Sequence, residues 1–395
     1  MKVIIKILFL FVISALAIYF MYNHKILDMN SLKNAFLEHK KILFFIAFLQ
    51  VLNCVFMTAR YFSLLRIFKI NTDFHNVTAA TFVSNGIGQW LPGSMAFIEV
   101  IRIGLMLGAE KFYLQEKNNN ISSKIENINA DNMQKSVVGT NLAQLSLKSK
   151  LLAISILDRL IGIGMMLSFG IIFSSYAFFL AIQNKIGITN SLVFFVLLSL
   201  ALLSIILLLP TLSKSLFFRK FISRIERIIL GIIKFKLMVI LIRKIFEELN
   251  SILDAIALGS RKMRSLWIPI FYSCLSVSTI TIATYFSAKA ISAYLPFHVI
   301  LAVLPMISLA SLVPMGLAGM GGMQLVAALL FSIFDISPLT ASSAQLLQTA
   351  VNLVAISGMG LLFARLSAKQ INAILKHRKN KNLLTKEKMS DITDI

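Results

Sequence analysis

Residues 77 to 107 read VTAATFVSNGIGQWLPGSMAFIEVIRIGLML, an apolar stretch that Leu91-Pro92-Gly93-Ser94 interrupts near its middle. Each arm has about 14 residues and, at about 1.5 Å per residue, extends about 21 Å. The apolar core of a bilayer is about 30 Å thick, so neither arm crosses it alone. Pro and Gly free backbone groups that lipid cannot satisfy, so we expect the break to be buried in protein or to line a wet cavity. The stretch predicts a re-entrant helical hairpin, with two ordinary spans joined at Pro92 as the alternative.

A second stretch, from Pro296 to Phe334, is built in the same way. It is interrupted by VPMGLAGMGG at residues 313 to 322, and its arms have about 17 and 12 residues. We therefore expect a second hairpin, with ordinary spans again as the alternative.

Six further stretches have the roughly 20 apolar residues that one membrane-spanning helix needs. They cover residues 4–22, 42–59, 160–182, 190–211, 265–288 and 340–364. Of the 395 residues 57% are hydrophobic and only 14% are charged, against roughly 25% charged in soluble domains. We predict an all-α polytopic membrane protein with about six full transmembrane helices plus two re-entrant hairpins, or eight to ten spans if the arms also cross.

The order of these elements is repeated along the chain. With hairpins, each half reads span, span, hairpin, span, and the two halves have opposite orientations. Inverted repeats with broken helices that meet near the midplane form the substrate sites of many secondary transporters. The order therefore predicts an inverted repeat, although no residue-level repeat between the halves accompanies it.

The chain is strongly basic, with 39 Lys and Arg against 17 Asp and Glu and a net charge of +22. In a soluble chain this charge would point to nucleic acid. If the N-terminus is cytoplasmic, however, nearly all the basic residues fall in cytoplasmic segments, as the positive-inside rule requires. We therefore expect a bacterial inner-membrane protein with both termini in the cytoplasm and no nucleic-acid partner.

Three polar segments accompany the transmembrane region, which we place at residues 1–366. Residues 108–150 form an Asn-, Ser- and Lys-rich insert that predicts a cytoplasmic loop. Basic and apolar residues alternate over 212–264, which indicates amphipathic helices facing anionic headgroups or, more simply, membrane-surface connectors. Residues 367–395 form a basic cytoplasmic tail.

Ionisable side chains at membrane depth are costly and are functional candidates by default. Glu99 and Arg102 are spaced i and i+3 on the second arm of the first hairpin and can pair. Asp158 and Arg159 open the span at 160–182. A network of these four side chains near the cytoplasmic side would let the arginines hold a phosphate. Ion pairs that only orient helices are the alternative.

Neutral polar and flexible residues gather at the breaks and on the last span. They would contact a lipid headgroup, or would serve close helix packing and interhelical hydrogen bonds. Gln345, Gln348 and Asn352 are spaced 3 and 4 and form one polar stripe. The headgroup candidates are Asn85, Gln89, Pro92, Gly93, Pro314, Gly319, Gly321, Gln324, Gln345 and Gln348.

Signatures of enzymatic chemistry are absent from the sequence. It contains no P-loop, no His-Glu-x-x-His and no Gly-x-Ser-x-Gly motif. Cys54 and Cys274 both lie in apolar stretches and form no disulfide framework. An ATP-driven pump or a membrane hydrolase is therefore not expected, and neither is a cofactor or a metal.

Several of these motifs together resemble the transmembrane, flippase-like region of the lysylphosphatidylglycerol synthase family, over about residues 5 to 367. The motifs are ARYFSLLR at 59–66, Leu91-Pro92-Gly93-Ser94 followed by Glu99-x-x-Arg102, ILDRL at 156–160, and Pro314 with Gly319-x-Gly321. The sequence departs from the family pattern at two places. Glu99 follows Pro92-Gly93 at a slightly greater distance than the family's usual acid, and Met323-Gln324 stands where the family usually has Arg-Glu. The second departure argues against a mechanism in which an acid on the second hairpin carries a coupling proton.

The resemblance implies a stand-alone member without the synthase domain. As a function it implies a translocase that moves an anionic phospholipid or a lipid-linked glycan precursor between leaflets. The alternative is a non-transporting partner of an envelope lipid or polysaccharide biosynthesis enzyme, with 212–264 as its docking surface. A third hypothesis, an enzyme that uses Glu99 or Asp158 as a base on a lipid, has the least support.

Overall fold

The computed structural model describes residues 26–91, 97–108, 147–183, 265–310 and 321–393, together with some positions between 12 and 24 and between 197 and 250. Every regular element among these residues is a helix. The predicted spans 4–22 and 190–211, the basic segment 212–264 and most of the polar insert 108–150 lie largely outside the described residues.

Among the described residues, four helices are long and apolar enough to cross a membrane: α3 (Lys40–Ile67), α6 (Leu147–Gln183), α10 (Trp267–Ala290) and α13 (Pro338–Thr393). Their membrane-crossing sections include Lys40–Ile67, Ser149–Tyr176, Trp267–Ala290 and Pro338–Arg365. The polytopic helical class predicted from hydropathy is thus confirmed, and two of the predicted spans, 265–288 and 340–364, closely match α10 and the first half of α13.

Two span boundaries were wrong, and one helix is longer than expected. The predicted span 42–59 continues to Ile67, because apolar residues keep contacting neighbouring helices until Lys69 adopts a positive φ of 58° and ends the helix. The span predicted at 160–182 begins earlier, within a helix that starts at Leu147. The backbone of α13 remains helical through the basic tail to Thr393.

Within the described residues, the broken stretches form four short helices, none of which is long enough there to cross a bilayer. These are α4 (Phe74–Gly88), a helix over residues 97–108, α11 (Phe297–Ala310) and α12 (Gly322–Ser332). The longest has 15 residues and, at about 1.5 Å per residue, extends about 22 Å. Their lengths agree with two re-entrant hairpins.

Glycines permit the tight geometry at both breaks. A Cβ on Gly88 would lie 2.5 Å from Cγ1 of Ile98, so only glycine lets the end of α4 approach the second arm this closely. Gly321 has φ 96°, a conformation that side chains strongly disfavour, and directly precedes α12.

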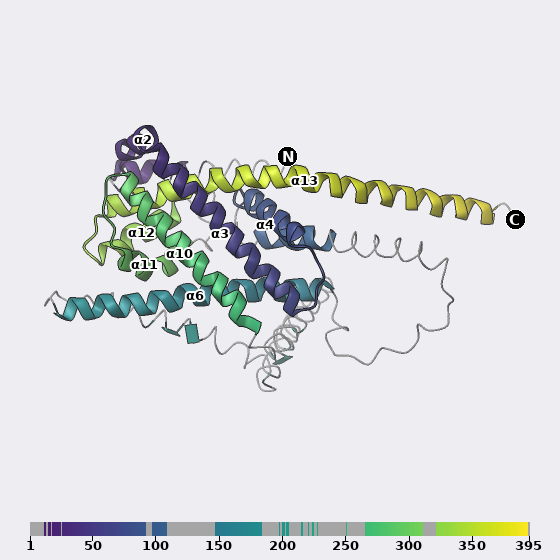
Figure 1. Cartoon of the computed structure of the whole chain (residues 1–395), viewed down its shortest axis with the longest axis horizontal. Helices are drawn as coiled ribbons and strands as arrows, with labels where there is room; N and C mark the ends of the chain where they lie inside the picture. The colour runs from purple at the N-terminus through teal and green to yellow at the C-terminus, as the bar shows by residue number, and fades with distance from the viewer. Residues whose placement is uncertain are drawn as a thin grey trace.

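The helix packing follows the inverted repeat. The first half contributes α3, α4, the 97–108 helix and α6, and the second half contributes α10, α11, α12 and α13. Helices α3 and α10 cross side by side at the centre, α4 packs on α13, and α11 packs on α6 (Figure 1). Exchanging the two halves converts the α4–α13 pair into the α11–α6 pair and leaves the α3–α10 pair unchanged, as a twofold relation requires. The two hairpins accordingly lie at opposite ends, with α4 at one end and α11 and α12 at the other (Figure 1).

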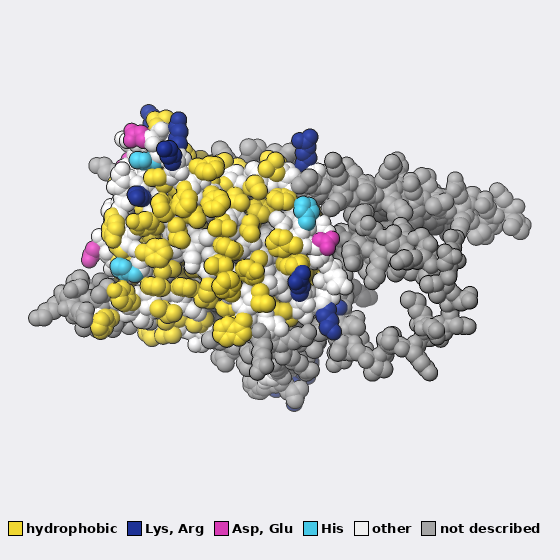
Figure 2. Space-filling view, viewed as in Figure 1, with side chains coloured by type: hydrophobic (Ala, Val, Ile, Leu, Met, Phe, Trp, Pro, Cys, Tyr) yellow, Lys and Arg dark blue, Asp and Glu magenta, His cyan; other side chains and the backbone are white. Residues whose placement is uncertain are grey.

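The outer face suits a lipid environment. Figure 2 shows apolar side chains over the middle of the visible face, with charged side chains toward its edges. Phe44, Phe48 and Phe271, on the crossing helices α3 and α10, are each more than half exposed. A soluble protein rarely exposes such a broad apolar surface, which supports integration in a membrane.

A short connector closes one end of the bundle. Helix α2 (Met29–Glu38) begins at Asp28, whose carboxylate accepts from the backbone N–H groups of Asn30 and Ser31. The Asp28 backbone N–H donates to Ser343 Oγ at 3.0 Å, and the Ser342 hydroxyl donates to the Ile26 carbonyl. These contacts join the segment before α3 to the start of α13.

Candidate functional site

Five charged side chains from three elements meet inside the helix bundle. They are Arg60 on α3, Glu99 and Arg102 on the 97–108 helix, and Asp158 and Arg159 on α6, and we call them the charged cluster. Three arginines face two carboxylates, so the charged cluster carries one excess positive charge. The expected network of four side chains is brought together, with Arg60 as a fifth member.

Asp158 is the acceptor at the centre of the charged cluster. Its side chain is fully buried, and its carboxylate accepts from Arg60 Nε at 2.6 Å and Arg60 Nη2 at 3.1 Å. This two-point contact is the strong geometry for an arginine and a carboxylate. Gly162, one turn further along α6, leaves room for the guanidinium, because a Cβ there would lie 2.7 Å from Arg60 Nη1.

Arg102 is the most deeply placed member. Its Nη2 donates to Glu99 at 2.5 Å and to Asp158 at 3.3 Å, and its guanidinium lies 4.0 Å from the centre of the Tyr61 ring. Its Nε and Nη1 have no hydrogen-bond partner, so the aromatic face is their main compensation. Arg102 does not line the cavity described next, and its position suits a structural role better than the predicted phosphate contact.

Arg159 is more accessible. Its Nε donates to Glu99 Oε1 at 2.6 Å, and its Nη2 forms an ion pair with the same oxygen at 2.6 Å. The side chain is 21% exposed, against 0% for Arg102. Because Arg159 also lines the cavity described next, its guanidinium is accessible to a ligand there.

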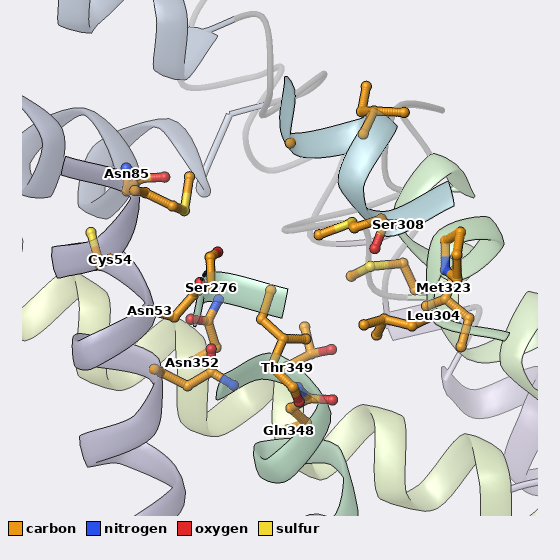
Figure 3. A pocket seen from close by; sticks show the side chains of 18 of the residues that line it. Asn53, Cys54, Asn85, Ser276, Leu304, Ser308, Met323, Gln348, Thr349 and Asn352 are labelled. Atoms are coloured by element: carbon orange, nitrogen blue, oxygen red, sulfur yellow. Dashed lines mark hydrogen bonds between the residues drawn. The ribbon is translucent and has the colours of Figure 1, made fainter. Parts of the chain in front are cut away.

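A cavity of about 270 Å³ lies between the two broken-helix regions. Figure 3 shows side chains converging on it from several helices, with Asn53 and Cys54 from α3, Asn85 from α4, Ser308 from α11 and Thr349 from α13. Its polar lining residues are Gln50, Asn53, Arg60, Asn85, Gln89, Arg159, Ser276, Ser308, Gln345, Gln348, Thr349 and Asn352.

The charged groups that line this cavity have one sign. Arg60 and Arg159 belong to the lining, whereas Glu99 and Asp158 contact the arginines without belonging to it. Guanidinium groups bind phosphate and carboxylate through parallel N–H donors. Within the described part of the chain, the cavity is therefore built for an anion.

Neutral polar residues on α10, α12 and α13 form a second polar group, which we call the amide cluster: Thr284, Gln324, Gln345, Gln348 and Thr349. Gln348 Oε1 accepts from the Thr284 hydroxyl at 2.8 Å. Gln324 is 1% exposed, and its Oε1 accepts from the Gly321 N–H at 2.6 Å while its Nε2 lies 3.5 Å from Thr349 Oγ1. Gln345, Gln348 and Asn352, the stripe expected from spacing, all line the cavity.

The remaining predicted site residues divide into three groups. Asn85 and Gln89 line the cavity; the Asn85 amide donates to the Thr81 carbonyl at 2.8 Å, and Gln89 Oε1 has no partner. Gly321 and Gln324 lie at the start of α12. Pro92, Gly93, Pro314 and Gly319 lie outside the described residues.

Arg60 is the functional candidate that sequence reasoning missed. It lies in the ARYFSLLR motif, but the predicted span 42–59 ends one residue before it. The apolar residues Tyr61, Phe62 and Leu64 after it were the signal that the helix continues. Asn53 was also missed; its Oδ1 accepts from Ser276 at 2.5 Å where α3 crosses α10.

Among the residues that the structure describes, no group of three or more His, Cys, Asp and Glu side chains could hold a metal ion.

These features define a polytopic helical membrane protein with a polar cavity between broken helices. Residues 139–360, more than half of the chain, match the family described as the lysylphosphatidylglycerol synthase TM region, and the chain belongs to this family. Its membership places the protein among membrane proteins of lipid-related processes. No curated protein and no solved structure matches the chain. The matched range includes Asp158, Arg159 and the amide cluster, whereas Arg60, Glu99 and Arg102 precede it.

Proposed function

We propose that this protein is an inner-membrane lipid translocase that moves an anionic phospholipid or a lipid-linked glycan precursor between leaflets. The cavity would hold the polar headgroup, while the acyl chains stay in the surrounding lipid. Membership of a lipid-related membrane family supports the proposal. The proposal involves no covalent step.

One observation carries the proposal, namely that the charged side chains lining the cavity are two arginines. A buried cation is costly unless it is paired. Glu99 and Asp158 supply that pairing from outside the lining, while the partly exposed guanidinium of Arg159 lines the cavity. This arrangement keeps the site stable when empty and leaves one positive charge in excess for the phosphate of a headgroup.

The inverted arrangement of the hairpins supports movement between leaflets. The hairpins lie at opposite ends of the bundle and both contribute residues to the cavity. Rocking one repeat against the other around a fixed site is how inverted-repeat transporters open alternately to each side. The same geometry would open this cavity to one leaflet at a time.

Movement of fluorescent phosphatidylglycerol in proteoliposomes tests the proposal. We expect the wild type to move the lipid and Arg159→Ala to slow it about tenfold or more, because a hydrogen bond to a charged group contributes about 1.5–3 kcal/mol. The matched control is Arg66→Ala, which removes an exposed arginine on α3 that lies over Phe62, away from the cavity. Equal slowing by both variants would refute the site.

The alternative role predicts a different result. If the wild type moves neither anionic phospholipids nor lipid-linked glycans, the translocase proposal fails and a non-transporting partner of an envelope-biosynthesis enzyme becomes the better hypothesis. Its candidate docking segment, 212–264, lies largely outside the described residues.

We further propose that both termini are cytoplasmic, from the distribution of basic residues. Single cysteines at the exposed positions Glu38 and Asn71, introduced after replacing Cys54 and Cys274, test this topology. An impermeant thiol reagent should label Glu38→Cys in intact cells and Asn71→Cys only after permeabilisation. The reverse pattern would invert the orientation.

A further inference from the structure

Four exposed lysines lie at the end of the bundle that the proposed topology places outside the cytoplasm. We call them the lysine surface: Lys33 on α2, Lys40 and Lys41 at the start of α3, and Lys289 near the end of α10. In Figure 2, Lys or Arg side chains gather at the end of the molecule where Figure 1 places α2. The positive-inside rule requires basic residues at the cytoplasmic end of a membrane protein, so it does not account for the lysine surface.

Two of these lysines lie on the lipid-facing side of α3. Lys40 precedes Phe44 by four residues and Lys41 precedes Phe45 by four, so each lysine shares a helix face with an aromatic side chain. Phe44 is 77% exposed, and Phe48, one turn further, is more than half exposed. A lysine at the border of such a face lays its apolar stem along the helix and extends its ammonium group to the headgroups.

Lys289 joins the same border from α10. Its Nζ lies 5.9 Å from the centre of the Phe286 ring, and that ring meets Phe45 of α3 edge-on, with 4.9 Å between the ring centres. The lysine is therefore linked to the first turns of α3 through two aromatic rings. Helices α3 and α10 thus present one apolar face with lysines at its edge.

Helix α2 adds a second element to this surface, because its residues divide into three faces. One face is buried against the bundle and contains Leu32 and Ala35. The next is exposed and mostly apolar, at the spacing i, i+4, i+7 and i+8, and contains Met29, Lys33, Phe36 and Leu37. The last is exposed and polar and contains Asn30, Asn34 and Glu38. A helix with an exposed apolar face beside a polar one lies in the plane of the membrane surface.

The acids on and beside α2 leave the positive charge of the lysine surface uncancelled. Asp28 caps α2, and its carboxylate accepts from two backbone N–H groups and from the Ser31 hydroxyl. Glu38 follows Lys33 by five residues and, at about 100° per residue, points to a different side of the helix. In the described part of the chain none of the four lysines forms an ion pair, so all four are available to an anionic partner.

We infer that α2 and the lysine surface bind the anionic phospholipid headgroups of the outer leaflet, at a place separate from the cavity. The ammonium groups bind the phosphates, while Met29, Phe36 and Leu37 insert between the acyl chains. None of the four lysines lines the cavity. The choice of leaflet rests on the proposed topology, whereas the binding itself requires neither that orientation nor any movement of lipid.

Quenching by brominated lipids in nanodiscs tests the inference, because both faces of a nanodisc offer the same lipids. A fluorophore on Leu37→Cys, introduced after replacing Cys54 and Cys274, reports the lipids beside α2. A lysine at an anionic membrane surface contributes about 1 kcal/mol, or about fivefold in affinity. In an equimolar mixture with each lipid brominated in turn, phosphatidylglycerol should therefore quench at least about twofold more than phosphatidylcholine. Raising the ionic strength from about 0.05 M to about 0.5 M should reduce this preference by screening. Equal quenching by the two lipids at low salt would overturn the inference.

Charge variants show whether the lysine surface causes the preference. The triple variant Lys33→Gln, Lys40→Gln, Lys41→Gln should abolish it, and the triple variant Lys33→Arg, Lys40→Arg, Lys41→Arg should keep it. The matched control is Arg66→Gln with Lys69→Gln, which removes exposed charges at the other end of α3 and should keep the preference. A preference that survives the three glutamines, or that the control abolishes equally, would refute the role of the lysine surface.

A second probe position tests how α2 lies. A fluorophore on Asn34→Cys, on the polar face of α2, should be quenched much less by either brominated lipid than the one on Leu37→Cys. Equal quenching at the two positions would refute an orientation with the Leu37 side toward the acyl chains. A Leu37→Cys probe that neither lipid quenches would show that protein, either a second copy or another chain, covers this face, and would overturn the assignment to lipid.

Discussion

Replacing Asp158 with asparagine tests how strongly the charged cluster holds the bundle together. Asp158 is fully buried and accepts from Arg60 at 2.6 and 3.1 Å and from Arg102 at 3.3 Å. Asp158→Asn keeps the shape and one acceptor oxygen but removes the negative charge, so the buried Arg60 guanidinium keeps its 3.2 Å contact with Ser273 Oγ and loses its countercharge. Breaking a buried ion pair at one partner costs about 3–5 kcal/mol, a large part of the roughly 5–15 kcal/mol that stabilises a typical protein.

The assay is reversible denaturant unfolding in detergent micelles, followed by tryptophan fluorescence. The matched control is Asp335→Asn, the same change of charge at an exposed residue outside the charged cluster, which should stay within about 0.5 kcal/mol of the wild type. The double variant Arg60→Met with Asp158→Leu should lose less stability than Asp158→Asn, because no unpaired charge remains at Arg60. If Asp158→Asn unfolds at the same denaturant concentration as Asp335→Asn, the charged cluster contributes nothing to stability and the reasoning is refuted.

Two further predictions concern local packing and capping. Gly86→Ala should destabilise the protein by about 1–3 kcal/mol, since its Cβ would lie 3.0 Å from Gly360 Cα and 3.1 Å from the Ile356 carbonyl; Gly358→Ala, which meets nothing within 4 Å, is the control and should be neutral or stabilising in a thermal melt. Asp28→Ala should cost about 1 kcal/mol at neutral pH through loss of the α2 cap. The Ser31 hydroxyl and then its backbone N–H lower the pKa of Asp28 from 3.8, so the difference between wild type and variant should be constant above about pH 5 and shrink as the pH falls through the lowered pKa. A difference that does not change with pH would contradict the role of the ionised carboxylate.

Hydropathy alone was sufficient to predict the class of protein and the positions of the two helix breaks. The apolar runs that became α10 and the first half of α13 were located within a few residues, because a bilayer demands about 20 apolar residues wherever a helix crosses. Pro92 and the glycines near residue 320 likewise marked the ends of helices too short to cross. The spacing of Glu99 and Arg102 predicted their pairing, since residues three apart share a helix face.

Arg60 shows where reasoning from sequence failed. A charged residue lowers the local hydropathy, so ending the span at residue 59 was the natural choice. The structure reverses this choice because Asp158, 98 residues further along the chain, supplies the countercharge that lets Arg60 remain inside α3. For the same reason Asp158 and Arg159 lie within a span and not at its start.

The sequence by itself determined that this is a helical membrane protein with two broken regions and a few intramembrane charges, because hydropathy and helix breaking are local properties. Only the tertiary structure decided which arginines line the cavity and that Arg102 stays behind it. Those outcomes depend on contacts between helices far apart in the chain, and no local pattern records which face of a helix meets which neighbour.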